Sequence, residues 1–377
     1  MLKFKVLDLT RLIPGAICSM MLADMGADVI KIEDPNGGDY MRWMGPQIDD
    51  SSVFFRMCNR NKRSVIINLK DERGQAVFKK LVETADVVIE GFRPGVMARL
   101  GCDYDSLRQI NPRLVYCSLS GWGADGPYVD HAGHDLNYVS VAGIIGAMET
   151  PQVLGGQFAD VGGAYAGVSG ILAALLQCAQ TGEGVFVDIS LSESSLPFVL
   201  YNWAEAVALG VPAGKGVLSG GLACYRVYHS RDELPLSLGT IEEKFWRNFC
   251  NAVERPDLIE LHQQPDEQAY LRRELAEIFA LKTAAEWDAI LSPADCCFML
   301  VRQISEVHTD VHYQARGALG IFPDGTPWMR SPIRLSTEQL SMENKIPGYG
   351  EHTRAILGDA GYSESELDDL TQSGVIR

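Results

Sequence analysis

The sequence predicts an α/β fold, with a large domain built on a parallel sheet and a smaller α+β domain after it. Three observations support this prediction. In the first half of the chain, short apolar strand-like segments alternate with helix-like segments. A glycine-rich stretch, residues 210–221, then interrupts the pattern. The length of 377 residues is sufficient for two domains, or for one large domain with an insertion.

The first domain is predicted from strands and helices that follow one another in turn. Three stretches carry helical patterns: Ala16–Met25, Glu72–Thr84 and the Ala-, Leu- and Gly-rich Tyr165–Gln180. Strands that alternate with helices indicate a parallel sheet covered by helices. Six segments have the composition of short buried strands: Val6–Leu9, Asp28–Ile32, Ser64–Leu69, Asp86–Glu90, Leu114–Leu119 and Val185–Leu191.

The second half of the chain has a different pattern. Ala223–Leu238 is typical of antiparallel strands, and Glu242–Leu281 and Ala284–Leu291 are typical of helices. The tail, Gly348–Arg377, indicates short helices. The predicted domain boundaries are therefore 1–209 for the large domain, 210–222 for a linker, 223–320 for the small domain and 321–377 for a C-terminal segment.

Composition excludes several classes of function. Acidic residues outnumber basic ones by 49 to 33, for a net charge of −16, which argues against nucleic acid or an anionic membrane as the main partner. We find no apolar run of membrane-spanning length and no signal peptide. The nine cysteines form no C-x-x-C pair, which favours free thiols and a cytoplasmic location.

Nucleotide and metal motifs are also missing. The first strand is followed by Thr10–Gly15, which is not G-x-G-x-x-G, and there is no P-loop, so a nicotinamide or flavin cofactor is disfavoured. His131 and His134 are spaced i, i+3, and His308 and His312 are spaced i, i+4. Neither pair has a third ligand at a fixed spacing, so we predict no metal site.

The chemically most informative stretch is Gly133-His134-Asp135-Leu136-Asn137-Tyr138, followed by Asp160, 26 residues after His134 (160 − 134). Histidine titrates near neutral pH, and a carboxylate can be kept basic by its surroundings. Two such groups on opposite sides of an acidic C–H would remove a proton from one face and return one to the other. The residues alone leave open that His134 is structural and that Asp160 is an N-cap.

Several further motifs occur in a characteristic order. They are Val6-Leu7-Asp8-Leu9-Thr10, Pro14-Gly15, Leu22-Ala23-Asp24-Met25-Gly26-Ala27-Asp28-Val29-Ile30-Lys31-Ile32-Glu33, Asn61-Lys62-Arg63-Ser64, Glu90-Gly91-Phe92-Arg93-Pro94-Gly95, Asn111-Pro112-Arg113-Leu114 and Ser120-Gly121-Trp122-Gly123. With this order and spacing, nearly the whole chain resembles the class III CoA-transferase and α-methylacyl-CoA racemase superfamily.

The resemblance implies one of two chemistries. Asp160 matches an aspartate that transferases use as a nucleophile and racemases use as an acid/base, whereas His134 matches the racemase histidine. Glu242 matches a third active-site carboxylate, which we expect to orient or polarise His134. The implied activity is interconversion of (R)- and (S)-2-methylacyl-CoA by 1,1-proton transfer through an enolate, with no cofactor beyond the CoA thioester substrate. The alternatives are a class III CoA-transferase with Asp160 as nucleophile and an inactive acyl-CoA-binding protein.

The proposed reaction needs hydrogen-bond donors for the enolate, and the resemblance implies where CoA is held. Backbone N–H groups near Asp160, or at Gly162 and Gly163, are expected to stabilise the enolate. Racemases of the family often carry an arginine directly after Glu33, where this chain has Asp34. Either one of three arginines, Arg11, Arg42 or Arg60, substitutes for it, or the nucleotide end of CoA is held differently. The implied CoA contacts are Ile67, Asn68, Leu69, Lys70, Gly91, Phe92, Arg93, Arg99, Gly133, Asp135, Leu136, Asn137 and Tyr138.

For the assembly, the resemblance implies a large Rossmann-like domain, a smaller α+β domain and a C-terminal return to the large domain. It further implies an interlocked homodimer, with the active site between the large domain of one subunit and the small domain of the other. In that arrangement His134 and Asp160 come from one subunit and Glu242 from its partner.

Overall fold

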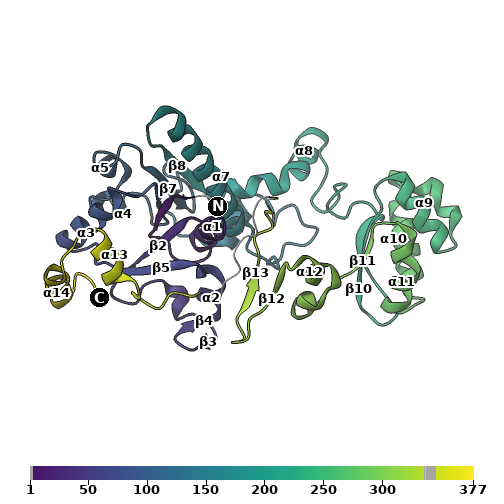
Figure 1. Ribbon diagram of the computed structural model, residues 1–377. Coiled ribbons are helices and arrows are strands. Elements are labelled where there is room, and N and C mark those ends of the chain that lie inside the picture. The colour runs from purple at the N-terminus through teal and green to yellow at the C-terminus, as the bar shows by residue number, and fades with distance from the viewer. Residues whose placement is uncertain (1–2, 335, 337–344) are drawn as a thin grey trace. The chain divides into compact units, whose positions relative to one another are not determined.

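A computed structural model describes residues 3–334, 336 and 345–377. Its first unit is built on a six-stranded sheet in the order β5-β2-β1-β6-β7-β8, in which every neighbouring pair is parallel (Figure 1). All six predicted strands are confirmed, with ends shifted by a few residues. The strands are β1 (Lys5–Asp8), β2 (Asp28–Glu33), β5 (Lys62–Ile66), β6 (Val87–Glu90), β7 (Val115–Ser120) and β8 (Phe186–Ser190).

The strand order reverses at the middle of this sheet. From β1 the chain moves outward through β2 to β5, and then returns to the other side of β1 through β6, β7 and β8. In open parallel sheets of this kind, ligands bind beyond the carboxyl ends of the strands at the point of reversal. The topology therefore places a candidate site at the ends of β1 and β6.

Alternate residues of each strand supply two separate cores. Val6 of β1 packs with α1 (Ile13–Asp24) and α7 (Phe158–Thr181) on one face of the sheet. Its neighbour Leu7 packs on the other face with α3 (Glu72–Val82), α13 (Thr353–Asp359) and α14 (Glu364–Gln372). The period-two alternation of a strand produces this division. Because both faces are covered, the strands are apolar on both sides, as the sequence indicates.

Helix α7 differs from its prediction in a way that matters for function. It begins at Phe158 instead of Tyr165, so Asp160 lies in its first turn. Among the described residues, α7 is the one helix that is long and apolar enough to cross a membrane, judged by its length and composition alone. The expectation that no apolar segment reaches this length is therefore wrong. In the structure, α7 packs against α1, β7 and β8 through buried residues such as Val168 and Ile171.

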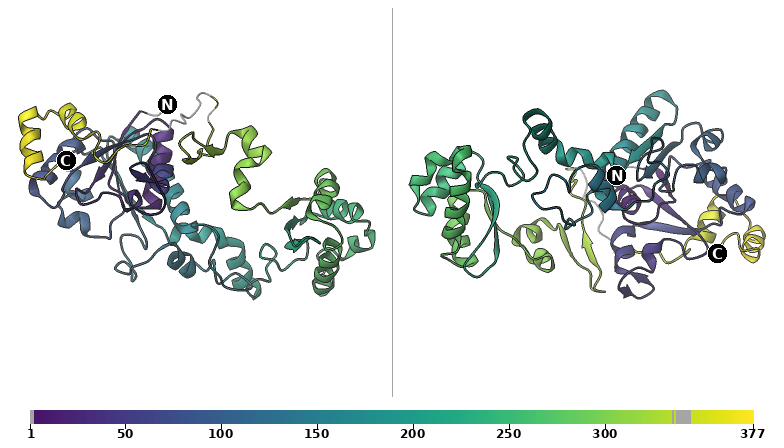
Figure 2. Two further views of the ribbon diagram at one scale, coloured as in Figure 1. Left: turned by 90° about the horizontal axis from the view of Figure 1, so that it is seen from below. Right: turned by 180° about the vertical axis from the view of Figure 1, so that it is seen from behind.

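The second unit contains an antiparallel sheet in the order β11-β10-β9, which confirms the predicted antiparallel strands. Helices α9, α10 and α11 gather beside this sheet (Figures 1 and 2). Its core includes Trp246, Phe249, Phe279 and Trp287. The elements are β9 (Tyr225–His229), β10 (Pro235–Gly239), β11 (Phe298–Leu300), α9 (Glu243–Ala252), α10 (Gln268–Phe279) and α11 (Ala284–Leu291).

The prediction of continuous helix over Glu242–Leu281 is wrong. Between α9 and α10 the chain forms two short 3-10 segments, Pro256–Leu261 and Pro265–Glu267. Each segment begins with a proline, which has no N–H to donate to a helix and restricts the residue before it. The prolines therefore divide the segment into two helices, although the spacing of its apolar residues alone indicates one continuous helix.

The two units divide the chain differently from the predicted boundaries. The first unit comprises the described parts of 1–142, 155–195 and 310–377, and the second comprises 143–154 and 196–309. The predicted boundaries were 209 and 320. The second unit also includes α8 (Leu200–Leu209), and within the predicted linker 210–222 the structure has no helix or strand. The remaining elements are β3 (Gln47–Ile48), β4 (Ser51–Ser52), α2 (Val53–Asn59), α4 (Val96–Arg99), α5 (Tyr104–Leu107), α6 (Asp135–Val141), α12 (Val311–Arg316), β12 (Leu319–Ile321) and β13 (Pro327–Met329).

Candidate active site

A cavity of about 450 Å³ lies in the first unit at the carboxyl ends of β1, β6, β7 and β8. Arg11 follows β1, Phe92 follows β6, Trp122 follows β7 and Leu191 follows β8, and all four side chains line it. This is the edge of the sheet at which the strand order reverses. The cavity therefore lies where the topology places a ligand site.

His134 and Asp160 both line this cavity. His134 is the N-cap residue of α6, and Asp160 is the third residue of α7. Two helix starts that are distant in sequence thus bring a histidine and a carboxylate into one cavity. Proton transfer to and from a bound carbon acid needs two such groups, each within reach of the carbon.

The residues around His134 hold its backbone in place. The side-chain oxygen Oδ1 of Asn137 accepts a hydrogen bond from the His134 N–H at 3.0 Å. The Tyr138 hydroxyl donates to the Gly133 carbonyl at 2.6 Å. A Cβ at position 133 would lie 2.7 Å from Cε1 of the Tyr138 ring, and one at Gly121 would lie 2.4 Å from the hydroxyl. The motif therefore needs glycine at these two positions to admit the tyrosine.

Aromatic side chains form one wall of the site. The Trp122 ring meets the Tyr138 ring edge-on at 5.0 Å, and meets Tyr128 at 5.2 Å. Tyr128 packs against the His131 ring at 5.0 Å, and the indole N–H of Trp122 donates to the His131 carbonyl. His131 also lines the cavity. The sequence drew attention to His131 only as a metal ligand, and the described residues contain no group of three or more metal-binding side chains.

The environment of Asp160 favours its protonated form. Burial, and secondarily the charge of Asp135, raise the pKa of the Asp160 carboxyl from 3.8 to about 7. Asp160 is not the N-cap of α7, because that position is Gln157, which makes no side-chain capping bond. Instead, Oδ1 of Asp135 accepts hydrogen bonds from the N–H groups of Ala159 and Asp160.

The expected enolate donors at Gly162 and Gly163 are not available. Both residues lie inside α7, where Val161 N–H already donates to the Gln157 carbonyl and the following amides continue the helical pattern. A Cβ at Gly163 would lie 2.1 Å from Leu191, so this glycine serves close packing. The first-turn amides of Ala159 and Asp160 are used by Asp135.

The predicted CoA contacts fall into two groups. Gly91, Phe92, Arg93, Gly133, Asn137 and Tyr138 line the cavity. Asp135 and Leu136, the segment 67–70 and Arg99 are not among its lining residues. Ile67 is buried in the core and forms a bridge with Ile376, and Arg99 ends α4. The cavity accordingly covers only part of the surface that the resemblance assigns to CoA.

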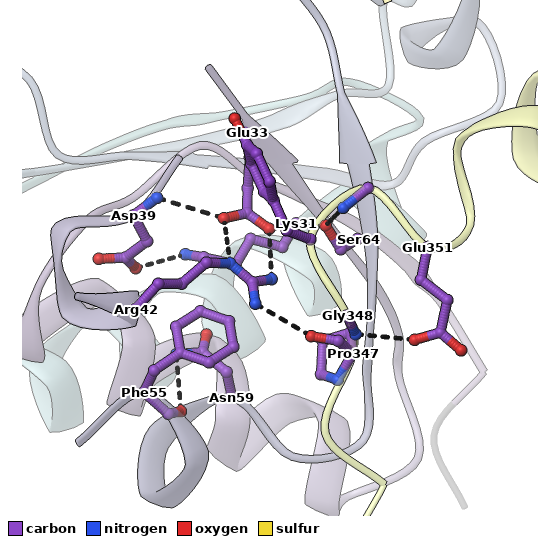
Figure 3. A network of polar contacts seen from close by, with 12 residues as sticks. Lys31, Glu33, Asp39, Arg42, Phe55, Asn59, Ser64, Pro347, Gly348 and Glu351 are labelled. Atoms are coloured by element: carbon purple, nitrogen blue, oxygen red, sulfur yellow. Dashed lines mark hydrogen bonds and ion pairs between the residues drawn. The ribbon is translucent and has the colours of Figure 1, made fainter. Parts of the chain in front are cut away.

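Two of the three candidate arginines are committed to the core. Arg42 donates to both carboxylate oxygens of Glu33, at 2.8 and 2.7 Å, and stacks on the Phe55 ring at 3.8 Å (Figure 3). Arg60 is buried and paired with Asp24. The expectation that Arg42 or Arg60 substitutes for the missing arginine is therefore wrong, because neither guanidinium is free to meet a phosphate.

Arg11 is the candidate that reaches the cavity. Its Nη1 donates to the Tyr40 hydroxyl at 3.0 Å, and its guanidinium lies 5.2 Å from the Tyr40 ring centre and 5.5 Å from that of Phe92. Its Nη2 lies 3.9 Å from Oδ2 of Asp34, a weak and partly exposed pair. A cation held between aromatic rings at a cavity suits an anionic or planar group.

Glu90 is a second carboxyl group with an unusual environment, and the sequence showed it only as part of a motif. It ends β6 and is buried, and burial raises its pKa from 4.5 to about 7 despite hydrogen bonds from Ser118 and Phe92. Its Oε2 accepts from the Phe92 N–H at 2.7 Å. Glu90 therefore holds the start of the 91–93 segment that lines the cavity.

Glu242, the third predicted catalytic residue, lies in the second unit. It is the N-cap of α9 and is exposed, and its carbonyl accepts from the N–H groups of Phe245 and Trp246. After burial, its charge is the next cause that raises the pKa of the exposed thiol of Cys297. The proposed action of Glu242 on His134 stays a prediction.

Comparisons with known proteins give these residues a family. The sequence model of CoA-transferase family III matches residues 2–353. The chain belongs to this family. Alpha-methylacyl-CoA racemase from Homo sapiens is 31% identical over 98% of this chain and 96% of its own length. Succinate--glutarate CoA-transferase from Agrobacterium fabrum is 33% identical, over 94% of each chain.

Solved structures agree with the family III assignment. A CaiB/BaiF family protein from Brucella suis superposes with a TM-score of 0.83 at 30% identity, over 95% of this chain and 98% of that one. The relatives named above are a racemase and a CoA-transferase at similar identity. Membership in family III therefore identifies an enzyme family but does not decide between the two activities.

Proposed function

We propose that this family III protein is an acyl-CoA racemase that interconverts (R)- and (S)-2-methylacyl-CoA thioesters. The observation that carries the proposal is that His134 and Asp160 line one cavity. A transferase mechanism uses the aspartate alone, whereas racemisation by 1,1-proton transfer uses two groups. A histidine that lines the same cavity as the family aspartate supplies the second group.

The proposed reaction moves one proton off the α-carbon and another onto it. In one direction, the ionised Asp160 takes the α-proton and becomes the neutral acid, while the electron pair of the C–H bond passes into the thioester as an enolate. The imidazolium of His134 then delivers a proton to the opposite face and becomes neutral. The reverse direction begins from this second protonation state and restores the first. General acids and bases of this kind typically contribute about 10²- to 10⁴-fold each.

The raised pKa of Asp160 supports acid/base chemistry over nucleophilic attack. With a pKa of about 7, the group takes up and releases a proton near neutral pH. A nucleophilic carboxylate has to be ionised, and the neighbouring charge of Asp135 opposes ionisation. The same environment that suits proton transfer therefore weakens the transferase proposal.

Substrate binding is proposed to use both the cations and the apolar residues of the cavity. Arg11 and Arg93 line it and are suited to the phosphates of CoA. Apolar side chains such as Leu12, Phe92 and Leu191 line it as well and are suited to the acyl portion. The proposed mechanism needs no metal and no redox cofactor.

Proton exchange with solvent tests the proposal. A panel of 2-methylacyl-CoA esters is incubated with the enzyme in D₂O, and the α-carbon is read by mass and by chirality. We expect deuterium incorporation with racemisation for the wild type, and losses of about 10²-fold or more for His134→Gln and Asp160→Asn. His312→Gln, an exposed histidine of α12, is the matched control and should be unaffected. No exchange with any ester would refute the racemase.

A CoA-transferase is the second candidate, and the Agrobacterium fabrum relative favours it. In that case the Asp160 carboxylate attacks the thioester carbonyl, CoA leaves as the thiolate, and an acyl–aspartyl anhydride forms. Hydroxylamine would trap this adduct, and CoA would exchange between two acids. Binding of acyl-CoA without either activity would instead indicate the inactive acyl-CoA-binding protein.

A homodimer with a site shared between subunits is proposed as the working assembly. Helix α8 has no buried residue, and its Tyr201, Trp203 and Val207 are exposed by 67%, 64% and 70%. An apolar surface of this kind is typical of one covered by a second copy. Sedimentation should give a dimer, and Trp203→Glu should weaken it.

The shared site has a sharper test. If Glu242 of one subunit serves His134 of the other, co-expression of His134→Gln and Glu242→Gln chains should produce mixed dimers that recover activity in one of their two sites. If each site is complete within one chain, the mixed dimers stay as inactive as their parents.

A cytoplasmic location also stays a prediction, which fractionation of cells would test.

A further inference from the structure

The carboxylate of Asp135 accepts hydrogen bonds from backbone amides at the start of α7. Its Oδ1 accepts two hydrogen bonds, from the Ala159 N–H at 2.7 Å and from the Asp160 N–H at 3.0 Å. These partners are 24 and 25 residues away in sequence. The first amides of a helix have no intrahelical acceptor, and a side chain usually supplies one from the N-cap position. Because Gln157 makes no such bond, Asp135 caps α7 from another helix.

Asp135 also follows His134 directly and begins α6. His134 and Asp160 are therefore connected by a single peptide bond and a single hydrogen bond. The two helices also pack against each other. The short connection determines how far apart the starts of α6 and α7 lie, and with them the two proposed bases.

We propose that Asp135 is a positioning residue, which fixes the separation of His134 and Asp160 and presents a second negative charge to the Asp160 carboxylate. This inference rests on the proposed proton-transfer function, because it explains how the two bases are held across one carbon. Asp135 would act through Asp160 and would not contact the reacting atoms itself.

The pair of carboxylates is unequal. Asp135 accepts hydrogen bonds from two backbone N–H groups at the start of a 24-residue helix. At Asp160, burial and then the charge of Asp135 raise the pKa of the carboxyl.

The other charged or titratable groups around Asp160 are accounted for. Tyr138 of α6 has its pKa raised by burial and then by Asp160, while Arg93 opposes that rise. Arg11, His131 and His134 line the same cavity from neighbouring loops. Asp135 is the one residue among them that both contacts the Asp160 backbone and appears as a cause of its raised pKa.

Two substitutions separate the effect of the Asp135 charge from the effect of its hydrogen bonds to the Ala159 and Asp160 amides. Asp135→Asn keeps an Oδ1 acceptor for the two amides and removes the charge. Titration of the Asp160 carboxyl carbon by ¹³C NMR should then show its midpoint lowered by about one pH unit. The pH profile of α-proton exchange should move in the same direction. An unchanged midpoint would overturn the electrostatic role.

Asp135→Ala removes the acceptor as well. We expect faster hydrogen exchange at the Ala159 and Asp160 amides, and a kcat lower by about 10²-fold because the two bases lose their fixed separation. Unchanged amide protection together with unchanged kcat would overturn the positioning role. If this variant fails to fold, Asp135→Glu, which keeps a carboxylate but displaces it by one methylene, tests the positioning role by the same two measurements.

Asp103→Asn is the matched control. Asp103 also caps a helix, α5, through the Ser106 N–H, and is not among the cavity-lining residues. It should leave both the Asp160 midpoint and the exchange profile unchanged. The NMR and amide measurements need no substrate. A wild type without α-proton exchange would therefore refute the proposed function while these two measurements still test Asp135.

Discussion

Two carboxyl groups of the first unit, the fully buried Asp8 and the partly buried Asp160, behave in opposite ways. Asp8 ends β1 and is fully buried. Burial alone would raise its pKa, but the charges of Lys31 and Lys62, with hydrogen bonds from Ser19 and Thr10, outweigh burial and lower it. At Asp160, by contrast, burial and the like charge of Asp135 both raise the pKa, to about 7.

The comparison shows that neighbouring charges and hydrogen bonds, more than the extent of burial, decide whether the pKa of a carboxyl falls or rises. Asp8 is held ionised by two lysines and two hydroxyls, so it stabilises the end of β1 beside the cavity and carries out no proton transfer. Asp160 lacks any neighbour that lowers its pKa, so it is suited to exchange a proton. The predictions below test this contrast.

The largest expected effect is on activity at Asp160. Asp160→Asn should lower the rate of α-proton exchange by about 10²- to 10⁴-fold, because the proton acceptor is lost. Stability should stay unchanged or rise, since the substitution removes the repulsion from Asp135. The two properties are measured by exchange in D₂O and by urea unfolding. A large loss of stability would mean that Asp160 is structural like Asp8.

At Asp8 the expected effect is on stability. Asp8→Asn leaves the buried Lys31 and Lys62 without their shared carboxylate and should cost about 3–5 kcal/mol in the free energy of unfolding. Asp28→Asn is the control, since Asp28 forms a partly exposed pair with Arg63 and should cost about 1 kcal/mol or less. Equal costs in urea unfolding would contradict the contrast.

Glu90 should show an intermediate effect that depends on pH. Its pKa is 4.5 ordinarily and about 7 in the fold, so between these values the folded state binds the proton more tightly. Stability should therefore fall as the pH rises from 4.5 to 7, by up to about 3 kcal/mol. Glu90→Gln should flatten this part of the stability–pH curve. A variant with the wild-type slope would exclude Glu90 as its source.

The smallest expected effect concerns the loop that carries His134. Gly133→Ala places a methyl group against the Tyr138 ring, which has to shift. We expect exchange to slow on the order of tenfold, because the backbone before His134 moves with the ring. Gly155→Ala is the control, since nothing lies within 4 Å of its added Cβ. Similar rates for both variants would show that the loop tolerates movement.

Much of the fold was readable from local sequence. The strands of the large sheet were predicted because each is a short, mainly apolar segment in a chain where such segments alternate with helical patterns, and α11 was predicted from Ala284 to Leu291 as the structure has it. The motif around His134 and the position of Asp160 were likewise visible. The start of α7 was not, because residues before Tyr165 lack a strong helical pattern and the capping residue lies elsewhere in the chain.

The sequence by itself determined the parallel sheet, the family motifs and which histidine and aspartate are candidates for chemistry. Only the tertiary structure decided which partners the charged residues have. Asp135 caps α7, Arg42 and Arg60 form buried ion pairs with Glu33 and Asp24, and Arg11 reaches the cavity. The physical reason is that strand and helix patterns are local properties of a chain. The protonation of a carboxyl and the availability of a guanidinium depend instead on partners that folding brings from distant positions.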